Sequence, residues 1–181
     1  TGGNPSSIDG TIRSTISGAS FFFINPKGII FGPNAKIDVS GSFAASTADY
    51  LKLSDDARFV AAVGADDSHL SSAPVVAFGF LGSNTGSIGV QQTVSSVPLT
   101  VPDGNTLSLV GGDISINGAG MDASSLPLPT LKAAGGRINL VSVKGAGEVP
   151  LDVTTLTVDE FKAAFPQQGQ IELKAVVNVV V

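Results

Sequence analysis

Residues 21–32 read FFFINPKGIIFG, and this stretch decides what kind of fold the chain can form. Two short apolar runs flank a polar break, and each run has the length of a strand rather than of a helix. The break, Asn25-Pro26-Lys27-Gly28, has asparagine first, proline second and glycine fourth, as a type I β-turn prefers. The stretch therefore predicts two strands joined at a sharp corner.

The same pattern continues along the chain. Short apolar stretches alternate with breaks rich in Gly, Asn, Asp and Pro, and several of them alternate apolar and polar residues, as in residues 37–39, 107–109 and 114–116. Hairpin sandwiches and parallel solenoids share this spacing, but only Asp103-Gly104 resembles a two-residue hairpin loop. The pattern favours an all-β solenoid with rungs of roughly 18–24 residues, and hence about seven or eight rungs.

Two segments interrupt this rhythm and are predicted to leave the coil as excursions, one near residues 47–74 and one near residues 142–168. The second contains the best helical stretch, residues 159–165, with acidic residues at its start and Pro166 at its end. We therefore expect residues 1–181 to form a single β-helical domain with extra-helical excursions, and to be a fragment of a longer protein.

The composition excludes several classes of function. The 181 residues carry a net charge of −5, which argues against nucleic-acid binding. The chain has no cysteine and one histidine, His69, so neither a thiolate site nor a multi-histidine metal site can be built. No apolar run is long enough to span a membrane. We expect no cofactor, no metal and no transmembrane segment.

The carboxylates that could support catalysis occur as two adjacent pairs, Asp55-Asp56 and Asp66-Asp67. Glycoside hydrolysis needs two carboxyl groups that face one sugar, whereas neighbours on a strand point to opposite faces. Ser68 and His69 follow the second pair, but no G-x-S-x-G elbow accompanies them. Solvated loops explain these residues best, and we predict no enzyme activity.

Three consecutive phenylalanines raise a question of burial. Phe21 and Phe23 can share the inner face of a strand, so Phe22 must point outward. Phe22 is then either covered by the excursion near residues 47–74 or exposed as a contact surface. We expect it to be covered.

The opening stretch closely resembles the Asn-Pro-Asn-Gly-Ile motif of two-partner secretion domains, the N-terminal domains of filamentous-haemagglutinin-like exoproteins. Lys27 stands here in place of the second asparagine. Residues 33–43 also look like this family, particularly its cyanobacterial branch, and residues 107–114 and 134–140 look like its repeats. Residues 3–8, GNPSSI, are similar to a second family motif, Asn-Pro-Asn-Leu, with one extra residue and isoleucine in place of leucine.

The resemblance marks a set of candidates for recognition by a transporter. They are Asn4, Pro5, Ile8, Asn25, Pro26, Gly28 and Ile29. Turn chemistry alone also accounts for the residue types of the second motif, so a structural role stays open beside the recognition role.

The resemblance implies a right-handed parallel β-helix that is exported by the Sec route and then passes through a dedicated outer-membrane β-barrel partner. The periplasmic POTRA domains of that partner would recognise the domain while it is unfolded or extended. The resemblance implies no enzyme activity, and a location outside the cell or at its surface, associated with the outer membrane and reached via the periplasm. The chain would be a secretion-recognition and structural module of an exported adhesin or extracellular fibre protein.

Two further interpretations stay open. Exposed strand edges at the ends of a solenoid would let copies stack into a homopolymeric fibre. A different class of function is a carbohydrate-active β-helix, either a polysaccharide lyase or a binding module. That function would need a groove of paired carboxylates or a stripe of exposed aromatic residues, yet the chain has no tryptophan and one tyrosine, Tyr50.

Overall fold

The computed structural model describes residues 3–61, 71–155, 157–175 and 177–181, and regular structure in this part of the chain is mostly strand. The expected all-β class is therefore confirmed. The strands are β1 (Ser6–Ile8), β2 (Thr11–Arg13), β3 (Phe21–Ile24), β4 (Ile29–Phe31), β5 (Lys36–Asp38), β6 (Phe43–Ser46), β7 (Tyr50–Leu53), β8 (Arg58–Val60), β9 (Val75–Phe80), β10 (Ile88–Gln91), β11 (Leu99–Thr100), β12 (Thr106–Gly111), β13 (Ile114–Asn117), β14 (Pro129–Lys132), β15 (Arg137–Ser142), β16 (Gly147–Pro150), β17 (Ile171–Lys174) and β18 (Asn178–Val180). The helices are η1 (Val153–Thr155) and α1 (Val158–Ala164).

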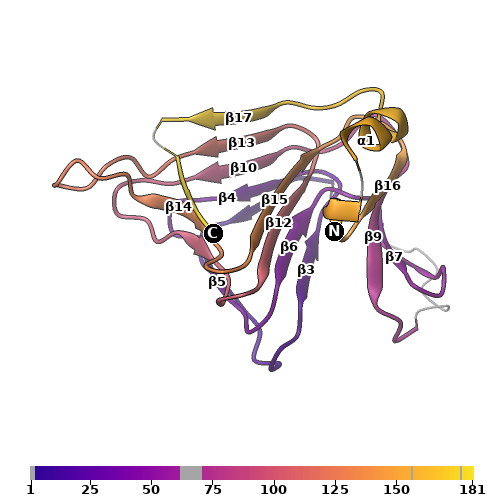
Figure 1. Cartoon of the computed structure of the whole chain (residues 1–181), viewed down its shortest axis with the longest axis horizontal. Helices are drawn as coiled ribbons and strands as arrows, with labels where there is room; N and C mark the ends of the chain where they lie inside the picture. The colour runs from indigo at the N-terminus through magenta and orange to yellow at the C-terminus, as the bar shows by residue number, and fades with distance from the viewer. Residues whose placement is uncertain (1–2, 62–70, 156, 176) are drawn as a thin grey trace.

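Most strands lie in parallel sheets whose strand order follows the chain (Figure 1). The β4 sheet has the order β1-β4-β10-β13-β17, and the β6 sheet has the order β3-β6-β12-β15. A third side consists of the parallel pair β2-β5 and the parallel set β11-β14-β18, with β11 next to β5. The chain visits the three sides in turn through β4, β5 and β6, and repeats this circuit through β10 to β12 and β13 to β15.

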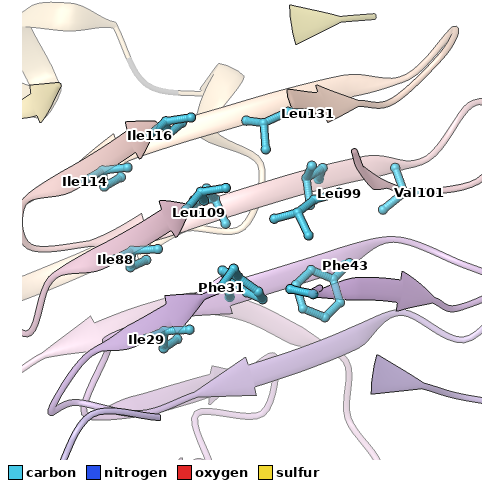
Figure 2. Packing of buried hydrophobic residues seen from close by; sticks show 14 of the residues in the cluster. Ile29, Phe31, Phe43, Ile88, Leu99, Val101, Leu109, Ile114, Ile116 and Leu131 are labelled. Carbon is cyan, nitrogen blue, oxygen red and sulfur yellow. The ribbon is translucent and has the colours of Figure 1, made fainter. Parts of the chain in front are cut away.

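The main hydrophobic core lies between these sheets and consists of residues stacked in columns (Figure 2). Register pairs place equivalent residues above one another, as in the columns Ile29–Ile88–Ile114 and Phe31–Val90–Ile116. Phe43 is 1% exposed and stacks on Phe21 with ring centroids 5.8 Å apart, while Phe31 meets it edge-on at 6.3 Å. Ser115, between Ile114 and Ile116, is half-buried on the opposite face, which confirms the predicted alternation.

Strands from the two segments that interrupt the sequence pattern combine with β9, which follows the first segment, into one further sheet. This outer sheet has the order β8-β7-β9-β16 and is antiparallel throughout. Register places Leu51, Phe78 and Val149 in one row, and these three side chains belong to a second buried cluster with Ala44 and Val110. The outer sheet therefore covers the outward face of the β6 sheet.

Phe22 is one of the side chains that this second cluster covers. Its ring centroid lies 6.3 Å from that of Phe78. Leu51, from the segment predicted to cover it, belongs to the same cluster, but Phe78 lies on β9, which begins at Val75, just after that segment. Phe22 is thus half-buried, as expected, and part of its cover comes from beyond residue 74.

Helix α1 confirms the predicted helical stretch. Its Phe161 packs against the second cluster, and Phe165, just after the helix, belongs to that cluster. Thr157 caps the helix: its hydroxyl oxygen accepts from the N–H of Glu160, and the Glu160 carboxylate accepts from the N–H of Thr157. The hydrogen bonds from Thr157 hold the pKa of Glu160 below its ordinary value. The rings of Phe161 and Phe165 lie 5.2 Å apart, and Phe165 is fully buried.

A polar cluster on the other face of the outer sheet links its strands. Glu148 accepts from the Tyr50 hydroxyl at 2.8 Å and from Lys52 Nζ at 3.0 Å, and the Arg58 guanidinium lies 4.3 Å from the centre of the Tyr50 ring. Register places Gly79 between Glu148 and Tyr50, and a side chain on Gly79 would collide with the Tyr50 ring. Gly79 therefore lets the tyrosine reach across β9.

Replacing Glu148 by glutamine is expected to lower the free energy of unfolding by about 1–2 kcal/mol at pH 7, the size of a hydrogen bond to a charged group. Burial raises the pKa of Glu148, but hydrogen bonds from Lys52 and Tyr50 outweigh burial and hold the pKa below its ordinary value. A carboxylate with a depressed pKa stabilises the fold above the unfolded pKa of about 4.3, and this contribution is lost as the pH falls through the folded pKa. Urea titrations at pH 7 and pH 3 should therefore show a smaller difference between variant and parent at pH 3. An equal difference at both pH values would contradict the assignment, and Glu172→Gln, in an exposed pair with Lys174, is the control.

Candidate functional site

Several candidate residues lie at the asparagine corner, the turn of residues 25–28 that leads from β3 to β4. The N–H of Gly28 donates to the Asn25 carbonyl oxygen at 3.0 Å, and the N–H of Lys27 donates to Asn25 Oδ1, also at 3.0 Å. The side chain thus braces the turn, as asparagine does in Asx turns. Gly28 has a φ of +124°, which favours glycine. The predicted turn is confirmed.

The Asn25 side chain also ties this corner to the N-terminal segment. Its Nδ2 donates to Ser6 Oγ at 2.8 Å and to the Asn4 carbonyl oxygen at 3.2 Å. The N–H of Ser6 donates to the Gly28 carbonyl oxygen at 2.9 Å, and a Cβ on Gly28 would lie 3.4 Å from Pro5 Cβ. The two motifs therefore meet in one place, the two-motif site, which comprises residues 4–8 and 25–29.

The members of the two-motif site differ in their access to solvent. Asn25 is 2% exposed, Ile29 is fully buried, and Ile8 is half-buried against the main core. The exposed residues of the site include Asn4, Pro5 and Lys27, and Pro26 is half-buried. A partner that binds the folded chain can therefore touch the first motif and the tip of the turn, but not the Asn25 side chain.

A comparable polar link occurs at the following corner, outside the two motifs. The backbone N–H and the Nδ2 of Asn34 donate to the Asp9 carboxylate at 2.8 and 3.0 Å. These hydrogen bonds hold the pKa of Asp9 below its ordinary value. Asn34 is exposed, so it is a natural control for Asn25.

Sequence reasoning missed two hydroxyl residues that occupy the strand position of Asn25 in other strands. Register places Asn25, Thr47, Gly111 and Ser142 in one column, each at or just after the end of a strand of the β6 sheet. Thr47 Oγ1 donates to the Gly86 carbonyl oxygen at 2.9 Å, and both hydroxyl residues are buried. The sequence did carry a signal for these two residues, because Thr47 and Ser142 each stand where an apolar strand pattern ends.

Glycines let successive turns of the chain lie close together at this corner. A Cβ on Gly86 would lie 2.5 Å from the Gly28 nitrogen, and a Cβ on Gly112 would lie 2.6 Å from the Gly86 carbonyl oxygen. The N–H of Gly112 donates to that same carbonyl at 2.9 Å. The backbones therefore pack directly on each other, which leaves no room for a larger residue.

The acidic pair in the described part of the chain belongs to a turn. Asp55 accepts from the N–H of Ala57 at 3.2 Å, and Asp56 pairs with Lys52 at 3.3 Å. A hydrogen bond from Ser71 and one from Ala57 hold the pKa of Asp55 below its ordinary value. The described residues contain no metal-binding group of histidine, cysteine and carboxylate side chains, and no helix among them is long and apolar enough to cross a membrane. Asp66, Asp67, Ser68 and His69 lie outside the described residues.

Parallel strands that meet at glycine-lined corners, with an asparagine turn at one of them, define an all-β protein built mainly from parallel sheets. The model of the TPS secretion domain family matches residues 1–176, and the chain belongs to this family. Searches of the curated proteins and of the solved structures found no match.

Membership of this family establishes the general role of the chain. TPS domains are the secretion-related domains of two-partner secretion exoproteins, which are exported with the help of a two-partner secretion transporter. The family is non-catalytic, in line with the prediction of no enzyme activity.

Proposed function

We propose that the chain is a non-enzymatic recognition and structural module of an exported adhesin or extracellular fibre protein. An outer-membrane transporter would recognise it through periplasmic POTRA domains, and the protein would reach the cell surface or the medium via the periplasm. The observation that carries this proposal is the set of hydrogen bonds from Asn25 to Asn4 and Ser6, because they join both secretion motifs in one site.

The proposal includes a right-handed parallel β-helix formed by residues 1–181 as a single domain, with excursions near residues 47–74 and 142–168. The repeated circuit through three parallel sides supports it, since parallel strands joined by crossovers within one sheet are almost always right-handed. Such a coil can grow rung by rung, because each completed rung offers an unpaired edge to the next.

Within the two-motif site we propose a division of labour. Asn25, Gly28 and Ile29 serve recognition indirectly, because they build the corner, whereas Asn4 and Pro5 are exposed and available for contact. Pro26 is half-buried, so it belongs fully to neither group. Ile8 packs against the main core and so anchors the first motif.

A secretion assay with the co-expressed transporter, combined with refolding of the purified chain, tests this division. The double variant Asn4→Ala/Pro5→Ala is expected to refold with parent-like stability but to lose most of its secretion. The matched control is Pro33→Ala/Asn34→Ala, which alters a neighbouring turn of the same residue types outside both motifs. Parent-like secretion of Asn4→Ala/Pro5→Ala would contradict a recognition role for the exposed residues, as would an equal loss in the control.

The proposal also includes end-to-end stacking of copies into a fibre. In the described part of the chain, β3 and β17 are edge strands of their sheets, and Leu173 of β17 is 54% exposed although its register partner Ile116 is fully buried. Sedimentation at rising concentration tests stacking, and a purely monomeric chain at the highest concentration would contradict it.

A further inference from the structure

A groove lies beside the second buried cluster, where the outward face of the β6 sheet meets the beginning of β9 and the residues after β16. Its volume is about 430 Å³. Phe22, Val75 and Leu151 supply apolar wall, and the floor consists of outward-facing residues of the β6 sheet. None of the residues that line the groove belongs to the two-motif site, and the proposed secretion function does not use the groove.

The floor of the groove carries two ordered columns of side chains. Phe22, Ala44, Ser108 and Asn139 are register partners on successive strands. The second column lies two residues away along each strand, on the same face of the sheet, and contains Ser20, Ser42, Thr106 and Arg137. Adjacent strands are about 4.8 Å apart, so polar groups recur at that interval along the floor.

Two planar polar groups stand at the β15 end of these columns. Arg137 Nη1 lies 3.5 Å from Asp152 Oδ1, and both side chains are more than half exposed. Asn139 is 8% exposed and donates from Nδ2 to Ser108 Oγ at 3.2 Å. The positive charge of the guanidinium is offset by the adjacent carboxylate, so the groove as a whole favours an uncharged ligand.

The construction of the floor argues against an extended peptide as the ligand. Peptides that join a sheet need free backbone N–H and carbonyl groups along an edge strand. Here the central floor strands, β6 and β12, have a parallel partner on both sides, so a peptide could pair only along the outer edges of the floor, β3 and β15, and not along its middle. Ser108 and Asn139 are buried, so the floor offers a ligand the second column: the hydroxyl groups of Ser20, Ser42 and Thr106 and the Arg137 guanidinium, with an apolar wall beside them.

We propose that this groove binds an uncharged oligosaccharide. A hexopyranose presents hydroxyl groups around an apolar C–H face, which matches a polar floor with an apolar wall. The spacing of the floor strands is comparable to the repeat of an extended chain of hexopyranoses, so successive sugars laid along the second column would meet a polar side chain from each successive strand. Among the described residues that line the groove, Asp152 is the one carboxylate, so a pair for general acid and base catalysis is lacking there, and we propose a binding site rather than a hydrolase or lyase centre.

The test is a titration of the ¹⁵N-labelled chain with uncharged hexasaccharides of glucose, mannose and N-acetylglucosamine in several linkages, and with the anionic hexagalacturonate for comparison, followed by amide chemical shifts. At least one sugar is expected to give saturable shifts confined to the groove, with a dissociation constant in the millimolar range. Arg137→Ala should weaken that binding about tenfold, the loss of one charge-assisted hydrogen bond. Thr106→Val is a second groove variant: it removes one hydroxyl group of the floor, keeps the side-chain volume and leaves both members of the Arg137–Asp152 pair in place.

The control is Arg13→Ala, because Arg13 and Asp38 form another exposed arginine–aspartate pair, on β2 and β5 away from the groove. This control should bind like the parent. Absence of saturable shifts from every sugar would overturn the proposal. Parent-like affinity in both groove variants, binding of hexagalacturonate alone, or shifts outside the groove would overturn it equally, and none of these results bears on secretion.

Discussion

Replacing Phe43 by alanine is expected to lower the free energy of unfolding by about 3–5 kcal/mol, as truncation of a buried phenylalanine does. Phe43 is 1% exposed, and its ring contacts both Phe21 of the preceding β6-sheet strand and Phe31 of the β4 sheet. Its loss opens a cavity where the β4 and β6 sheets meet, and the energetic cost of such a cavity adds to the lost burial of the ring. Urea unfolding followed by far-UV circular dichroism measures the effect.

The matched control for this prediction is Phe59→Ala. Phe59 lies on β8 of the outer sheet and is 39% exposed, so its truncation should cost much less. A loss below about 1 kcal/mol for Phe43→Ala, or an equal loss in the two variants, would show that the columns of Figure 2 do not carry the stability of the chain.

Replacing Asn25 by alanine is expected to lower the free energy of unfolding by about 2–4 kcal/mol. The substitution removes three hydrogen bonds made by one buried side chain, to Asn4, Ser6 and Lys27, and leaves polar partners behind without replacements. The loss should therefore appear in refolding of the purified chain, in the absence of any transporter. Secretion should fall as a consequence.

Asn34→Ala serves as the control, because Asn34 makes the same kind of link to Asp9 at an exposed corner. Its effect on the free energy of unfolding should be about 1 kcal/mol, the net contribution of an ordinary hydrogen bond. If Asn25→Ala refolded with parent-like stability and still failed to be secreted, the side chain would act in recognition itself, contrary to the division proposed above.

The local elements could be predicted from sequence because local chemistry determines them. The asparagine turn follows from residue preferences at each turn position, and the alternation at 107–109 and 114–116 fixes which side chains face inward. The helix follows from its acidic start and the proline after it. These features depend on neighbours within a few residues.

The long-range features could not be predicted in the same way. The sequence pattern suggests about seven or eight rungs, whereas the β4 sheet in the described part of the chain has five strands. The difference arises because β7, β8, β9, β16 and α1 serve the outer sheet and its cover. Pairing between β9 and β16 joins residues far apart in sequence, and no local pattern specifies such a partner.

The candidate site was predictable in its members but not in its assembly. Both motifs were recognised as stretches of sequence, yet nothing in either one says that Ser6 lies opposite Ile29. That register places Asn4 beside Asn25, and it depends on how β1 aligns with β4. The structure supplies the reason that this register matters: Asn25 is buried, and its side-chain amide finds partners in residues 4 and 6 of the first motif and in the turn itself.

The two buried hydroxyl residues at the ends of β6-sheet strands, Thr47 and Ser142, bear on where the chain can take up inserted sequence. The Thr47 hydroxyl binds Gly86, so the points where the chain departs and returns are held together whatever lies between them. Ser142 stands at the equivalent position, but its hydroxyl donates to the carbonyl oxygen of Gly112, on an earlier part of the chain, at 2.6 Å. Extra sequence inserted between Thr47 and Gly86 is therefore expected to leave the alignment of the neighbouring strands intact, which makes this segment the natural place to display a foreign loop.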